Sequence, residues 1–205
     1  MTADLSVHIV DDEEVLRDSL SFLFASRGIA TRVWPSGEAF LAAWPQPDCG
    51  CIILDVRMEG MSGPQVLDAL IQSEGSSAAL PPVIFLTGHA DVPLAVQSLK
   101  NGAFDFLEKP FNDNQIVDLA LAAMQMHHAR AAESDSRAAI AARFASLSAR
   151  EADVMALILD GQLNKQIADR LGIAIRTVEV HRSRVLQKTG ARNSVELAQM
   201  KARLG

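Results

Sequence analysis

The run Cys51–Asp55 constrains the fold of this chain more than any other stretch. Four apolar residues of strand length end in one carboxylate, and residues 56–63 then break regular structure. A continuous apolar run is typical of a strand covered on both faces, as in parallel sheets. Ligands of open parallel sheets bind beyond the carboxyl ends of the strands, which predicts a functional role for Asp55. Taken alone, Asp55 could equally be a turn-forming residue.

Strand-like and helix-like patterns alternate over the first part of the chain, which predicts an α/β fold. We expect strands at residues 6–10, 29–34, 51–54, 83–86 and 104–107, with a helical pattern after each one. This alternation predicts a flavodoxin-like, doubly wound, five-stranded parallel sheet. In that order the first and third strands are neighbours.

Charge divides the chain into an acidic front and a basic tail. The net charge is -6, but residues 143–205 carry eleven Lys or Arg against six Asp or Glu, which leaves -11 for residues 1–142. Two domains with different partners follow from this asymmetry, and the partner predicted for the second is a polyanion. The alternative is that these charges only solvate a small helical bundle, because a surplus of five positive charges is modest.

The remaining composition points to an ordinary globular protein of the cytoplasm. No apolar run is long enough to cross a membrane, and the first residues lack a signal-type core. Cys49 and Cys51 are too closely spaced for a disulfide framework and too few for a zinc site. We therefore expect buried thiols, a cytoplasmic location and no membrane partner.

An alanine-rich segment joins the two predicted domains. Residues 111–160 contain no Gly or Pro, which predicts a long helix whose break would fall at residues 134–136; a flexible linker is the alternative. His127 and His128 point to different helix faces and are predicted to be solvated. The predicted domains are residues 1–125 and 143–205, with a helical linker over 126–142.

The C-terminal part is predicted to be all-α. Ser148 and Glu151 have the spacing of a capping box, and Gly161 follows the helix that they begin. Two further helices, over 164–171 and 175–188, are joined at Gly172. Short helices connected by a glycine-containing turn are typical of a helix-turn-helix unit.

Polar side chains follow four of the predicted strands, at one edge of the sheet. They are Asp11, Asp12, Asp55, Thr87 and Lys109. Crowded carboxylates raise one another's pKa, and Mg²⁺ relieves this with oxygen ligands and retained waters. Asp55 could then act as a nucleophile toward phosphorus, while Lys109 neutralises the transferred group, and the product would be an aspartyl phosphate.

Four spaced motifs resemble the receiver domain of two-component response regulators over residues 5–125. They are Asp11-Asp12, Leu54-Asp55, Leu86-Thr87-Gly88 and the run from Phe106 to Phe111. The resemblance implies that a sensor histidine kinase phosphorylates Asp55, and that Thr87 and Phe106 switch position in response. It also implies Mg²⁺ bound by Asp12, Asp55 and the main-chain carbonyl of Arg57, with Asp11 acting through water, and a cis Lys109–Pro110 bond.

Residues 147–200 resemble the LuxR/FixJ-type helix-turn-helix. The motifs are Leu147 to Glu151, Gly161, Asn164 to Ala168, Leu171-Gly172, Thr177 to Arg182 and Lys188. Phosphate contacts are predicted for Asn164, Lys165, Arg176, Thr177, Arg182, Arg184 and Lys188, and base-edge contacts for Glu179, Val180 and Ser183. His181 is a packing residue or a DNA contact.

Together the two resemblances predict a DNA-binding transcriptional response regulator of the FixJ/NarL type. Phosphorylation would promote a homodimer through residues 92–120, which would bind two half-sites on double-stranded DNA and act with RNA polymerase. The protein would catalyse only its own phosphorylation and dephosphorylation.

Two alternatives remain open. A phosphatase with an aspartate nucleophile would need a second acid where Arg57 stands. A DNA-binding regulator that is independent of phosphorylation would use the receiver only as a dimerisation module.

Overall fold

The computed structural model describes residues 5–74, 80–88 and 92–204. The chain divides into two compact units, Met1–Ala131 and Ala132–Gly205. The domain and linker limits predicted from the sequence stay a prediction.

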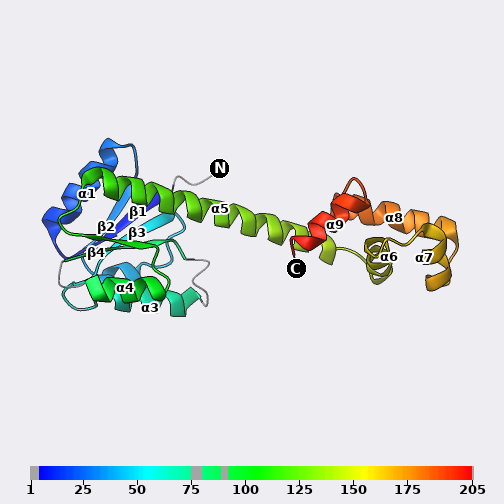
Figure 1. The fold of residues 1–205 in the computed structure, drawn as a ribbon, viewed down its shortest axis with the longest axis horizontal. Helices are drawn as coiled ribbons and strands as arrows, with labels where there is room; N and C mark the ends of the chain where they lie inside the picture. The colour runs from blue at the N-terminus through cyan, green and yellow to red at the C-terminus, as the bar shows by residue number, and fades with distance from the viewer. Residues whose placement is uncertain (1–4, 75–79, 89–91, 205) are drawn as a thin grey trace. The chain divides into compact units, whose positions relative to one another are not determined.

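The first unit contains a parallel sheet of five strands in the order β2-β1-β3-β4-β5 (Figure 1). The strands are β1 (Ser6–Val10), β2 (Thr31–Trp34), β3 (Cys49–Asp55), β4 (Val83–Thr87) and β5 (Asp105–Glu108). This confirms the predicted doubly wound fold and the pairing of the first strand with the third. The third strand begins earlier than predicted, at Cys49, because Cys49 pairs with Ser6 at the start of β1, before a shift in register.

Helices cover both faces of the sheet. They are α1 (Glu14–Ser26), α2 (Gly37–Ala42), α3 (Gly63–Glu74), α4 (Val92–Lys100) and α5 (Asp113–Ala145). Alternate residues of β3 enter opposite cores, since Ile53 packs with Phe24 and Ile116, whereas Leu54 packs with Phe40. In Figure 1, α1 and α5 lie along one face, and α3 and α4 along the other. The predicted break at residues 134–136 is absent from α5, which is helical throughout its bounds.

The second unit contains the helices α6 (Ala149–Leu159), α7 (Asn164–Leu171), α8 (Ile175–Thr189) and α9 (Ser194–Ala202). The capping box is confirmed: the Ser148 hydroxyl accepts from the Glu151 amide, and the Glu151 carboxylate accepts from the Ser148 amide. Gly172 has a φ of 64°, a left-handed conformation that lets the chain turn from α7 to α8. α9 is not among the predicted helices, although Asn193 caps it by accepting from the Glu196 amide.

The side chains buried in the second unit come from all four of these helices. Val154, Ile167, Val178, Val185 and Leu197 are fully buried in one cluster. In the first unit Cys49 and Cys51 are free and buried, as predicted. No helix in the described residues is both long and apolar enough to span a bilayer.

Candidate functional site

Asp55 ends β3 and is 6% exposed. The backbone that follows it turns back tightly against the strand. The Gly63 amide donates to the Val56 carbonyl, and a Cβ on Gly63 would lie 2.3 Å from the Asp55 carbonyl oxygen and 2.9 Å from the Phe85 ring. The start of α3 can therefore lie against the end of β3 only because residue 63 is glycine.

The Lys109 ammonium joins two buried carboxylates. Its Nζ lies 2.6 Å from Asp55 Oδ1 and 3.1 Å from Asp11 Oδ2, and the more exposed Glu13 carboxylate is 3.9 Å away. Lys109 follows β5, where its amide donates to the Thr87 carbonyl and its bond to Pro110 is cis, as predicted. The ends of β1, β3 and β5 thus converge on one cation.

Burial and charge act on Asp55 in opposite directions. Burial raises the pKa of Asp55, the nearby Asp11 charge adds to this, and the hydrogen bond and charge of Lys109 oppose it. Burial lowers the pKa of Lys109, but the bonds and charges of Asp55 and Asp11 outweigh this and raise it overall. Lys109 therefore favours the ionised form of Asp55, which is the nucleophilic form.

The two predicted switch residues lie on neighbouring strands of the sheet. Thr87 is fully buried at the end of β4, and its hydroxyl donates to the Gly88 carbonyl at 3.1 Å. Phe106 on β5 is half-buried against the core cluster that contains Phe85. Their switching role stays a prediction.

The predicted metal ligands supply hard oxygen donors. Asp12 is exposed, and its Oδ2 accepts from the Glu59 amide at 2.9 Å, while Asp55 Oδ2 accepts from the Arg57 amide at 2.8 Å. Across residues 5–74, 80–88 and 92–204, no three His, Cys, Asp or Glu side chains form a metal-holding group. Mg²⁺ requires only one or two carboxylates when it keeps its waters, so two carboxylates and the Arg57 carbonyl fit it.

Both carboxylate oxygens of Asp11 already have partners within the protein. Its Oδ1 accepts from the Glu13 amide at 2.8 Å, and its Oδ2 is bound by Lys109. Its predicted action on a metal through water stays a prediction.

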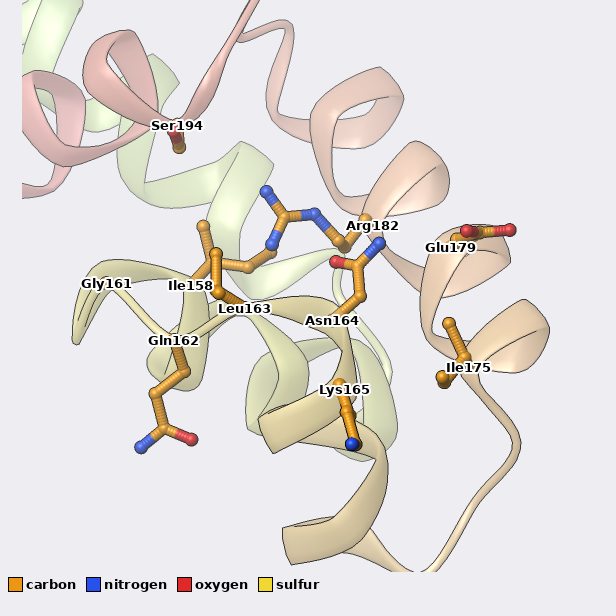
Figure 2. Close-up of a pocket in the computed structure, with 10 residues that line it drawn as sticks. All are labelled: Ile158, Gly161, Gln162, Leu163, Asn164, Lys165, Ile175, Glu179, Arg182 and Ser194. Atoms are coloured by element: carbon orange, nitrogen blue, oxygen red, sulfur yellow. The ribbon is translucent and has the colours of Figure 1, made fainter.

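The predicted DNA contacts lie on α8 and at the start of α7. Val178, Val185 and Thr189 are the buried residues of α8, and most of the residues predicted to contact DNA lie on its exposed side. The predicted contacts Lys165, Arg176, Thr177, Glu179, Val180, Ser183 and Arg184 are exposed, and Asn164 and Arg182 are half-buried. Asn164, Lys165, Glu179 and Arg182 line one cleft (Figure 2).

Lys188 forms a structural ion pair in the second unit, a role that is not predicted from the sequence. Its ammonium lies 2.6 Å from the buried Glu151 carboxylate and 3.3 Å from the Ser146 carbonyl oxygen. The predicted phosphate contact of Lys188 stays a prediction, and it would compete with this ion pair. His181 Nδ1 is buried and has no hydrogen-bond partner among the described residues. Whether His181 packs or contacts DNA stays a prediction.

Both units match known families. Residues 7–121 match the response regulator receiver domain, and residues 145–201 match the LuxR family of bacterial regulatory proteins. The chain belongs to the two-component response regulators of the FixJ/NarL type. This response regulator is therefore a DNA-binding transcriptional regulator. Receiver domains of this kind generally bind Mg²⁺ at the acidic phosphorylation site.

Relatives and solved structures extend over nearly the whole chain. The C4-dicarboxylate transport transcriptional regulatory protein DctR of Rhodobacter capsulatus is 73% identical, covering 95% of this chain and 98% of the relative. FixJ of Rhizobium meliloti is 43% identical, covering 96% and 95%. The solved structure of the response regulator StyR has a TM-score of 0.89 at 33% identity, covering 98% of this chain and all of that one. Full-length FixJ from B. japonicum has a TM-score of 0.61 at 38% identity, covering 100% and 98%.

The Glu151–Lys188 ion pair predicts a specific response of the second unit to acid. The hydrogen bond from Lys188, followed by that from the Ser148 amide, lowers the pKa of Glu151 from 4.5 to about 2. Because the pKa is lower in the folded state, the ionised carboxylate stabilises the fold above pH 4.5, and this stability is lost as the pH falls toward about 2. Glu151→Gln should lower the free energy of unfolding at pH 7 and flatten its dependence on pH in that range.

Urea denaturation followed through NMR signals of α6 and α8 measures this free energy. Asp169→Asn, at an exposed position on α7, is the matched control and should behave as the wild type. An unchanged pH dependence in Glu151→Gln would contradict the assigned ion pair.

Proposed function

We propose that phosphorylation of Asp55 by a sensor histidine kinase controls DNA binding by this response regulator. The observation that carries the proposal is the Lys109 ammonium held between Asp55 and Asp11. A carboxylate oxygen of Asp55 attacks the phosphorus of the donor's phosphohistidine, the bond from phosphorus to the histidine nitrogen breaks, and the aspartyl phosphate forms. Lys109 then neutralises an oxygen of the transferred group.

Asp12, Asp55 and the Arg57 carbonyl would hold Mg²⁺, which would further neutralise the phosphoryl oxygens. Two features of the site itself act on Asp55. Burial keeps water from Asp55, and the bond from the Arg57 amide orients its carboxylate.

We infer that the new charge is transmitted through Thr87 and Phe106. The phosphoryl group adds about -1.5 to -2 charges and three strong acceptors. The Thr87 hydroxyl leaves the Gly88 carbonyl to donate to it, and Phe106 repacks into the vacated space. The face of residues 92–120 then pairs with that of a second copy, and two helix-turn-helix units bind two half-sites with greater avidity than one.

Asp55→Asn should abolish incorporation of phosphate from a small phosphodonor, because an amide oxygen is a far weaker nucleophile than a carboxylate. Labelling with radioactive acetyl phosphate in the presence of Mg²⁺ measures this. Asp68→Asn, at an exposed position on α3, is the matched control and should label as the wild type does. Undiminished labelling of Asp55→Asn would refute the assigned acceptor.

We also propose that the target genes serve C4-dicarboxylate transport, with RNA polymerase as the partner at the promoter. The support is the identity to DctR of Rhodobacter capsulatus, which extends over 98% of that relative.

The exposed residues of α8 are suited to base edges. Glu179 accepts from a cytosine amino group, and Val180, 45% exposed, contacts a thymine methyl.

Arg182→Ala should weaken binding to DNA from upstream of such transport genes and reduce the slope of log affinity against log salt by about one, because one phosphate contact is lost. Fluorescence anisotropy across a salt series measures both. Arg203→Ala, at the end of α9, removes the same charge outside the proposed interface and should retain the slope. An unchanged slope in Arg182→Ala would contradict its phosphate role.

A further inference from the structure

The loop of residues 56–62 follows Asp55 directly and carries Arg57. Two carboxylates from other parts of the chain hold its backbone. Asp12 Oδ2 accepts from the Glu59 amide at 2.9 Å, and Glu38 Oε1 accepts from the Met61 amide at 2.8 Å. The loop is thus fixed on one side by the acidic site and on the other by the first turn of α2.

Close packing around Glu38 shows that this contact is built into the fold. Gly60 has a φ of 81°, and a Cβ on it would lie 2.6 Å from Glu38 Oε1. A Cβ on Gly37 would lie 2.4 Å from a methyl carbon of Val66, which places the start of α2 directly against α3. The Glu38 carboxylate thus reaches Met61 beside Gly60, whose positive φ favours glycine, and Glu38 itself follows Gly37, which has no room for a side chain.

The Glu38 carboxylate is a charged acceptor. The hydrogen bond from its own amide is the largest effect and lowers its pKa, burial opposes this, and the smaller effects of the bonds from Met61 and Ser36 lower it further. Hydrogen bonds to an ionised acceptor are shorter and stronger than neutral ones. Glu38 is thereby suited to hold a backbone segment from an exposed position.

The two anchors of the loop differ in what else they bind. Asp12 is a proposed Mg²⁺ ligand, so the oxygen that holds Glu59 is one that the metal can take. Glu38 lies outside that ligand set. We propose that Glu38 is a positioning residue, which keeps the loop and hence the Arg57 carbonyl in place when Asp12 turns to the metal. This inference rests on the proposed function of Asp55 as a phosphoryl acceptor in a Mg²⁺ site.

Glu38→Ala should free the Met61 amide and weaken the metal site. In the metal-free protein, amide exchange at Met61 should become faster than in the wild type. Mg²⁺ affinity, measured by calorimetry, should fall about tenfold, as is typical when a group that orients a ligand is removed. The rate of labelling by acetyl phosphate at subsaturating Mg²⁺ should fall with it, and saturating Mg²⁺ should restore most of the rate.

Two further variants separate positioning from a general loss of stability. Glu38→Gln retains an acceptor oxygen and should recover most of the Met61 protection and Mg²⁺ affinity. Asp68→Ala removes an exposed carboxylate from α3 and should match the wild type in every measurement.

The outcomes distinguish failure of this inference from failure of the proposed function. If the wild type is labelled at Asp55 and Glu38→Ala retains its Mg²⁺ affinity and labelling rate, the positioning role is overturned. A Glu38→Gln variant as impaired as Glu38→Ala also overturns it, since the acceptor oxygen would then be irrelevant. If the wild type is not labelled at all, the proposed function fails, while Met61 exchange and Mg²⁺ affinity still decide the role of Glu38.

Discussion

The ion pair of Lys109 with Asp55 and Asp11 is the interaction on which the first unit's chemistry depends. A parallel sheet brings the carboxyl ends of its strands to one edge, so β1 and β3 place two carboxylates together. Burial disfavours the ionised form of Asp55, and the ammonium after β5 opposes this effect. In the proposed function, the same arrangement would stabilise the Asp55 charge before phosphoryl transfer and the phosphoryl charge after it. The Lys109 ammonium thus binds both carboxylates in the resting site and is the group that would neutralise charge in the proposed reaction.

A comparable pair organises the second unit. Lys188, near the end of α8, binds Glu151 at the start of α6, which is 4% exposed at its side chain. This contact ties the helix that carries the predicted base contacts to the first helix of the bundle. The two ion pairs thus have different roles. In the proposed function the first prepares Asp55 as a nucleophile, and the second holds α8, which is predicted to contact DNA, to α6.

The sequence predicted the features that depend on local pattern. Apolar runs located the strands, and the Ser148–Glu151 spacing and Gly172 located the start of α6 and the turn after α7. The roles of Glu38 and Lys188 were not predictable in this way, because their partners Met61 and Glu151 lie 23 and 37 residues away in the chain. Lys188 was interpreted from its place in a basic helix, whereas its contact comes from tertiary packing. The helix α9 was missed although Asn193 and Glu196 have the spacing of a cap.

The account's central claim is that charge at Asp55 controls pairing of the chain on DNA. Sedimentation velocity with a two-half-site DNA measures this most directly, for the wild type and Asp55→Asn, with and without Mg²⁺ plus beryllium fluoride as a phosphoryl mimic. The account predicts that only the wild type with the mimic forms a dimer that binds both half-sites. Equal association and DNA binding by both proteins in every condition would contradict it, and would make the receiver a fixed dimerisation module.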